Sequence, residues 1–164
     1  MRIALAFILL LLSSASYAQE PKVTSVGVTE FGIYTAELVK AEKAPGTVAG
    51  TTNIVTHMRL VARTRTIPAK THTAFGFRFN LVGTPDGVIV PLHAVTIFPS
   101  AMTDPATHVS KTQSESDIGL TIGAVGYHGY EMDDEWEVLP GVWTFQIWSQ
   151  GRKLAEQSFT VQRE

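Results

Sequence analysis

The C-terminal stretch, residues 136–161, constrains the fold of this chain more than any other part of the sequence. It holds an alternating run of apolar and polar residues at 141–148, a short segment with a glycine at 149–152, and a second alternating run that ends at Val161. Alternation with a period of two is typical of a β-strand with one buried face. Two such runs joined by a short glycine-containing segment predict an antiparallel hairpin.

The register of this hairpin follows from the numbers of its apolar residues. Residues that lie opposite each other on antiparallel strands share a face of the sheet. Burying the apolar residues of both runs requires Trp143 opposite Phe159 and Ile147 opposite Ala155. A two-residue turn gives the opposite parity, so we expect either a three-residue turn or a β-bulge in the last strand. Trp148 then lies on the outer face, opposite Leu154.

The rest of the sequence carries strand patterns and one weak helical signal. Phe75, Phe77 and Phe79 recur at period two and predict a buried stripe. We expect one helical turn at residues 36–43 and a loop with little structure at 99–116. The other expected strands are residues 23–35, 53–66, 71–82, 88–98 and 117–125. Short strands separated by turns predict an all-β, immunoglobulin-like antiparallel β-sandwich of seven to eight strands.

The N-terminus predicts export. Arg2 precedes an unbroken apolar run at 3–12, and Ser16 and Ala18 supply the small residues that a signal peptidase reads. We therefore expect residues 1–18 to be a signal peptide and residues 19–164 to form a single domain. The sequence contains no cysteine, and export without disulfides favours a bacterial periplasm or exterior. The formal net charge of −2 gives no indication of nucleic-acid binding, and we expect no stable membrane insertion after the signal peptide is removed.

Three stretches of the sequence resemble a family of small exported bacterial proteins known as a domain of unknown function, DUF3859. The third stretch, close to the C-terminus, is the most specific. The resemblance implies an immunoglobulin-like domain and export, and it brings no activity, cofactor or catalytic residue. The residues that carry it are Phe31, Gly32 and Tyr34; 66–69 with Phe75 and Gly76; and 137–148 with 154–159.

Familiar catalytic and metal-binding motifs are missing from the sequence, and we predict no cofactor and no metal. The five histidines do not have the spacing of a local metal clamp. His57 and His72 could meet only if their strands pair, and we expect both to face solvent. The acidic run at 131–137 could attract calcium, but it lacks the spacing of a dedicated loop, so we expect a solvated acidic loop.

We interpret the chain as a non-catalytic binding or accessory module whose ligand is a protein or small molecule of the cell envelope. The candidate binding surface comprises Tyr127, His128, Tyr130, Trp136 and Trp148. One alternative is a periplasmic enzyme with a histidine–carboxylate site near His128 and Glu131. Another is a chaperone-like protein that binds extended peptides along an edge strand at residues 88–98.

Charge is segregated along the sequence. Residues 44–85 contain basic residues and no acid, whereas residues 112–151 contain acidic residues and no Lys or Arg. The two segments either neutralise each other across adjacent strands or form separate poles that orient a partner. We favour neutralisation.

Overall fold

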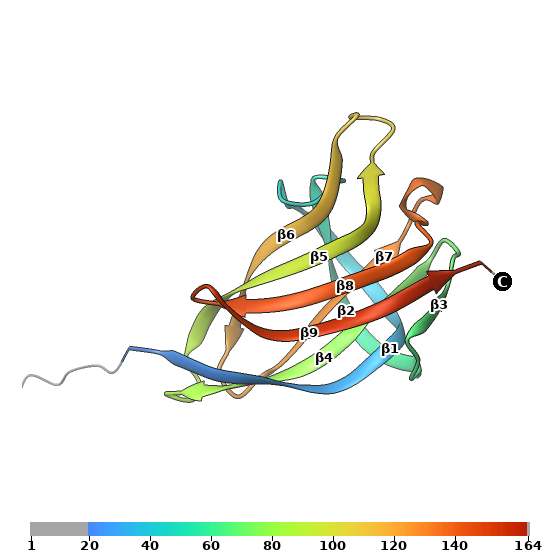
Figure 1. The fold of residues 1–164 in the computed structure, drawn as a ribbon. Helices are drawn as coiled ribbons and strands as arrows, with labels where there is room; N and C mark the ends of the chain where they lie inside the picture. Colours follow the sequence, from blue (N-terminus) through green and yellow to red (C-terminus); the bar gives the residue numbers. More distant parts are fainter. Residues whose placement is uncertain (1–19, 164) are drawn as a thin grey trace, which may run out of the picture.

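Nine β-strands and one 3₁₀ turn make up residues 20–163, the part of the chain that the computed structural model describes (Figure 1). The predicted signal peptide lies outside the described residues. The elements are β1 (Lys22–Lys43), β2 (Thr51–Ala62), β3 (Thr66–Pro68), β4 (Thr73–Thr84), β5 (Ile89–Thr103), β6 (Ser110–Thr121), β7 (Val125–Met132), η1 (Glu135–Glu137), β8 (Gly141–Ser149) and β9 (Arg152–Gln162).

The strands form two packed sheets. One sheet has the order β2-β1-β4-β7 and the other β3-β9-β8-β5-β6. All neighbours are antiparallel except β3 and β9, which run parallel. The predicted all-β sandwich is confirmed, with nine strands in the described residues rather than seven to eight, since the three-residue β3 has too short a pattern to be recognised in the sequence. No helix within residues 20–163 is long and apolar enough to cross a membrane.

Two local predictions were wrong. Residues 36–43 are not helical but continue β1, because they pair with residues 51–56 of β2 and this pairing overrides a weak helical propensity. The expected loop at 99–116 is mostly strand, since β5 extends to Thr103 and β6 begins at Ser110. Only the tip between them is a turn, where the Asp104 carboxylate accepts hydrogen bonds from the Ala106 N–H and the Thr107 hydroxyl, each at 2.8 Å.

The strand expected at 88–98 is present as part of β5, but its expected place at an edge is wrong, because β5 is an inner strand. It pairs with β6 on one side and with β8 on the other. Proline is tolerated here because the pairing with β8 covers only His93 to Ile97, and Pro91 lies before it. The missing N–H of Pro91 therefore removes no hydrogen bond between β5 and β8.

The C-terminal hairpin has the predicted register. Trp143 pairs with Phe159 and Ile147 with Ala155. The turn has two residues, Gln150 and Gly151, and a register shift directly after Ile147 restores the parity. Of the two expected solutions, the structure uses the bulge.

Trp148 lies on the outer face of β8, as predicted. Because of the bulge, it pairs with Lys153 rather than with Leu154. Its indole N–H donates a 2.8 Å hydrogen bond to the Gln146 side chain, and the residue is half-buried.

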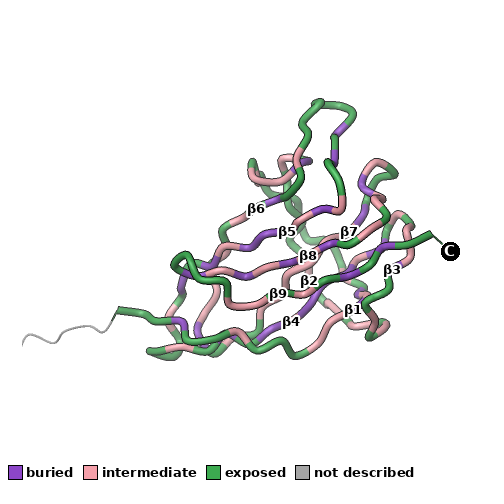
Figure 2. Tube along the Cα trace, viewed as in Figure 1, coloured by how far each residue is buried: buried purple, intermediate pink, exposed green. Residues whose placement is uncertain are grey.

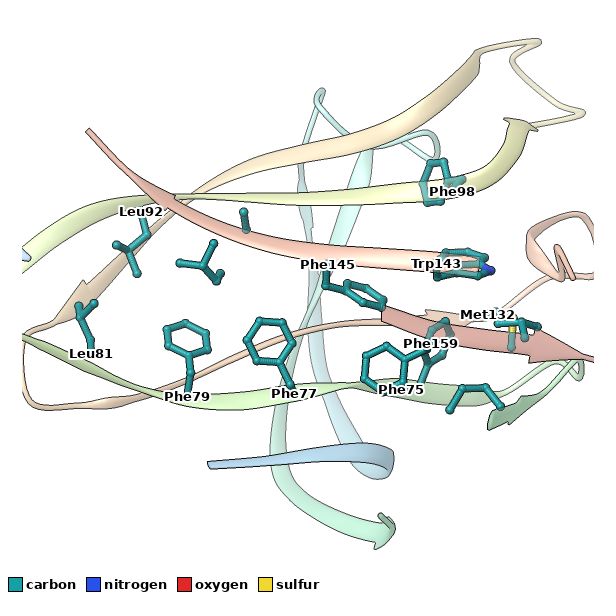
Figure 3. Packing of buried hydrophobic residues seen from close by; sticks show 14 of the residues in the cluster. Phe75, Phe77, Phe79, Leu81, Leu92, Phe98, Met132, Trp143, Phe145 and Phe159 are labelled. Carbon is teal, nitrogen blue, oxygen red and sulfur yellow. The ribbon is translucent and has the colours of Figure 1, made fainter. Parts of the chain in front are cut away.

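The aromatic stripe of β4 forms the centre of the core. The Phe75 ring makes edge-to-face contacts with Trp143, Phe145 and Phe159 of the opposite sheet, with ring centroids 5.4, 5.5 and 5.6 Å apart (Figure 3). All four side chains are fully buried. In Figure 2 the buried positions follow β4, β5, β8 and β9 through the interior. Aromatic pairs of this geometry stabilise beyond their buried area by about 0.5–1.5 kcal/mol each.

Residues 35–59 form a long projection that we call the arm. It consists of the second part of β1, the first part of β2 and the connection between them, and it crosses the sandwich behind β5 and β8 (Figure 1). At its tip the Gly46 carbonyl accepts a 3.2 Å hydrogen bond from the Glu115 N–H of β6. Lys111 Nζ donates a 2.9 Å bond to the Pro45 carbonyl. Val48, only 3% exposed, anchors the tip in the hydrophobic core.

Replacing Phe75 with alanine tests the role of the aromatic contacts. We expect Phe75→Ala to lower the free energy of unfolding by about 3–5 kcal/mol, because it removes a buried ring that contacts three others. Urea denaturation followed by tryptophan fluorescence measures this loss. The control is Val142→Ala on the exposed side of β8, for which we expect a change within about 0.5 kcal/mol. Similar losses for the two variants would contradict the assignment of the core.

Candidate functional site: a cleft beneath the arm

A cleft of about 920 Å³ lies between the arm and the strands β5, β6 and β7. Its size is within the usual range for ligand pockets, about 300–1,000 Å³. It is lined by residues 42–47, 51–55 and Met58 of the arm; His93, Ala94 and Thr96 of β5; 114–118 of β6; 127–131 of β7; and by Ala36, Ala49, Ala74, Asp133 and Glu137.

The floor of the cleft is made of small side chains on the inner face of β5 and β6. Thr96 pairs with Ser114, and Ala94 pairs with Ser116. Beside the cleft, between β4 and the strands β8 and β9, the space between the sheets is filled by phenylalanine and tryptophan rings. Short side chains cannot fill the same distance between sheets. The cleft is therefore a consequence of which residues occupy the inward positions of β5 and β6.

Ser114 is the most informative residue on this floor. It is 7% exposed, and its Oγ has no hydrogen-bond partner among the described residues. Leaving a buried hydroxyl without a partner costs about 1–3 kcal/mol, so such groups are rare in folded proteins. Ser114 is therefore a buried polar group in the wall of the cleft that the described residues leave without a partner.

His128 contributes a neutral ring to the cleft. Its Nε2 donates a 3.0 Å hydrogen bond to the Val95 carbonyl, and the ring packs edge-on against Phe77 and Phe145. Although His128 lies on an edge strand and is partly exposed as a residue, its ring is inside the sandwich. Burial lowers the pKa of His128 from 6.5 to about 4. At neutral pH the imidazole is uncharged.

The structure does not support the predicted catalytic pair of His128 and Glu131. His128 pairs with Phe77, which points into the core, whereas Glu131 pairs with Ala74 on the opposite face of the sheet. Successive residues of a strand point to alternate faces, so residues three apart cannot meet. The two side chains lie on different sides of β7.

Tyr130 and Glu137 form a buried brace at the end of β7. The Tyr130 hydroxyl donates a 2.6 Å hydrogen bond to Glu137, which also accepts bonds from the backbone N–H groups of Asp133 (2.6 Å) and Asp134 (3.1 Å). Glu137 is 5% exposed, and burial raises the pKa of its carboxyl. Burial, and next the Glu137 charge, raise the pKa of Tyr130 above its usual range. The expectation of a fully solvated acidic loop was therefore wrong for Glu137.

Tyr127 lies on the outer face of β7, beneath the arm. Its hydroxyl lies directly over Gly129, so that a Cβ there would collide with it, and its ring meets Tyr34 edge-on with centroids 5.1 Å apart. Burial raises the pKa of the Tyr127 hydroxyl above its usual range. The glycine gives the tyrosine a flat surface to pack on.

The five predicted surface residues do not form one patch. Tyr127, His128 and Tyr130 all line the cleft, but from both sides of β7. Trp136 packs against the core, and Trp148 lies on the outer face of the other sheet.

The walls of the cleft carry an excess of carboxylates. Burial, and then the neighbouring Asp133, raise the pKa of the Glu131 carboxyl. His72, Glu131 and Asp133 each place a potential ligand atom within 4.8 Å of the other two. His57 is not part of this group: β1 lies between β2 and β4, and His57 Nδ1 is instead 3.0 Å from Glu37. The acidic lining residues are Glu42, Glu115, Asp117, Glu131, Asp133 and Glu137, against a single lysine, Lys43.

The two charged segments of the sequence do not neutralise each other through direct contacts. Within residues 20–163, no Lys or Arg of 44–85 forms a salt bridge with an acid of 112–151. Arg78 faces Tyr127 on β7 but pairs with Glu30 on β1, at 3.3 Å. Arg63 and Arg65 lie over the Phe31 ring, 5.0 and 4.3 Å from its centroid. The predicted ion pairs between the segments were therefore wrong.

Sequence reasoning missed Ser114 and Ser116. Both share the parity of Ile118 and Leu120 on β6, so a strand assignment would have placed two serines on an inward face. The expected loop at 99–116 includes both serines, so the alternation that places them on an inward face was not recognised.

The fold and the cleft together define the chain as an immunoglobulin-like β-sandwich with a side cleft. It is similar to the crystal structure of an immunoglobulin-like protein from Pseudomonas aeruginosa, with a TM-score of 0.60 and 24% sequence identity over 85% of this chain and 98% of that chain. A second similar structure is the alkylpurine DNA glycosylase AlkC from Pseudomonas fluorescens bound to DNA with an abasic-site analogue. Its TM-score of 0.41 and 14% identity, over 61% of this chain and 28% of that chain, are too low to carry an argument. No curated protein matches the sequence.

Residues 22–161 match the model of a family described as a domain of unknown function, DUF3859. The chain belongs to this family, as the sequence motifs predicted.

The burial of His128 predicts a pH dependence of stability. Its folded-state pKa lies below that of the unfolded chain, so the unfolded state takes up the proton first as the pH falls. The stabilisation is complete above the ordinary value of 6.5 and is lost as the pH falls towards about 4. Relative to His128→Gln, which stays neutral, we expect the protein to lose about 2 kcal/mol between about pH 7 and about pH 5. Urea denaturation at both pH values measures this difference, and parallel stability curves would contradict the buried, neutral ring.

Proposed function

We propose that the protein is an exported, non-catalytic binding module whose ligand lies in the cleft beneath the arm. The observation that carries this proposal is the unpartnered hydroxyl of Ser114 on a floor of small side chains. A domain that needed only stability would fill this space with apolar side chains, as it does in the aromatic core beside the cleft.

The chemistry of the cleft supports binding rather than catalysis. Glu131 points away from His128, and the Nε2 proton of His128 is held by a backbone carbonyl. Tyr130 and Glu137 are occupied with each other and with the backbone of the 3₁₀ turn. A general acid or base must reach the reacting group, and these side chains are already used to hold the structure together.

The compartment is part of the proposal and rests on residues 1–18 of the sequence. Expressed in a Gram-negative host, the full chain is expected in the periplasmic fraction or in the medium. N-terminal sequencing of the isolated protein is expected to begin at Gln19, because the small residues at 16 and 18 direct cleavage after Ala18. A product that retains Met1 in the cytoplasm would contradict export.

Two serine-to-leucine variants test whether ligands bind in the cleft. Ser116 lines the cleft, whereas Ser100 is exposed and outside it. The protein is screened by thermal denaturation against sugars, amino acids, polyamines and short peptides. A ligand at about a hundred times its Kd stabilises by about 2.7 kcal/mol. We expect Ser116→Leu to abolish the shift given by a ligand and Ser100→Leu to preserve it. A shift that survives in both variants would place binding elsewhere.

A further inference from the structure

Two edge strands border the cleft, and they differ in whether the backbone along their free side is covered by another part of the chain. Both β6 and β7 end their sheets, so each pairs with one neighbouring strand only. The free side of β6 is held by the arm, through the Gly46–Glu115 hydrogen bond and the Lys111 contact with Pro45. Among the described residues, the free side of β7 has no paired strand. An exposed strand edge is a template for adding another strand.

The side chains of β7 would set the sequence of an added strand. Tyr127 and Glu131 point to the outer face beneath the arm, and His128 and Tyr130 point to the inner face. Side chains that lie opposite each other on neighbouring strands come within about 4.5–5.5 Å at Cβ. Outward residues of a bound strand would therefore meet Glu131, and inward residues would meet a neutral wall.

The charge of the cleft favours a basic partner. Of the six acidic residues that line it, Glu115 and Asp117 contact His93, Glu42 contacts Lys40 and Glu137 is held by Tyr130. Glu131 and Asp133, which stand beside each other at the end of β7, are left to face a ligand. The buried Ser114 hydroxyl, which has no partner in the described chain, lies in the same cleft and can bond a polar group of the incoming strand. Charges of opposite sign across an interface give specificity and faster association.

We propose that the cleft binds an extended polypeptide segment that pairs with the free edge of β7 and carries lysine or arginine at alternate positions. This inference rests on the proposed function, because it names the ligand of the same cleft. The cations point outward to Glu131 and Asp133, and the intervening side chains are neutral and point to the inner wall. Main-chain hydrogen bonds supply affinity, and the alternate side chains supply specificity.

The test uses a short, fluorescently labelled peptide that alternates lysine and valine, with anisotropy as the measurement. A peptide that alternates glutamate and valine, and a lysine–valine peptide that is N-methylated at alternate residues, serve as probes of charge and of backbone pairing. We expect only the unmethylated lysine–valine peptide to bind.

Two variants with the same change in net charge locate the contact. Glu131 lines the cleft, whereas Glu135 is exposed and does not. We expect Glu131→Gln to weaken binding of the lysine–valine peptide about threefold to tenfold. Glu135→Gln is expected to leave the affinity within a factor of about two.

Equal binding of the lysine and glutamate peptides, equal effects of the two variants, or undiminished binding of the N-methylated peptide would each overturn the inference. These failures are distinct from failure of the proposed function. If a different ligand of the thermal screen still loses its shift in Ser116→Leu, the cleft remains the binding site and only the peptide assignment falls.

Discussion

The edge-to-face contacts between Phe75 and the rings of Trp143, Phe145 and Phe159 determine how the two sheets stack. They join an inner strand of one sheet to two adjacent strands of the other. On the other side of β4, β7 lies against β5 and β8, because the His128 ring contacts Phe145 and its Nε2 donates to the Val95 carbonyl. The position of the cleft therefore follows from the aromatic packing directly beside it.

The space between the sheets differs in composition from one pair of strands to the next. Between β4 and the strands β8 and β9 it holds phenylalanine and tryptophan side chains, whereas the inward residues of β5 and β6 at the cleft are Ala94, Thr96, Ser114 and Ser116. The arm does not compensate by filling the space but closes over it, held by Val48 and by the hydrogen bond from Glu115 to Gly46. A Cβ at position 46 would collide with the Glu115 carbonyl, so glycine is needed for the close approach. The arm and the floor together form a cleft with unpaired backbone on one side.

Features that depend on local periodicity could be predicted from the sequence. The stripe of Phe75, Phe77 and Phe79 and the pairing of Trp143 with Phe159 follow from the two-residue period and from parity. The same parity would have ruled out a pair of His128 and Glu131, because residues three apart on a strand face opposite sides.

Features that depend on which strands become neighbours could not be predicted in this way. That β5 lies between β6 and β8, or that residues 36–43 extend a strand, is set by pairing between distant parts of the chain. The arm and its contact with β6 belong to this group. A single sequence contains no signal for contacts of this range beyond the general capacity of the segments to form strands.

Hydrogen exchange of the backbone amides gives the most direct test of the central claim that ligand binds in the cleft along the free edge of β7. The measurement compares residue-level exchange with and without the lysine–valine peptide. The account predicts slower exchange in β7 and no change at residues 59–62 of β2, the part of the sheet's other edge strand that does not line the cleft. Protection at residues 59–62 without protection in β7, or unchanged exchange in β7 while the peptide is bound, would contradict it.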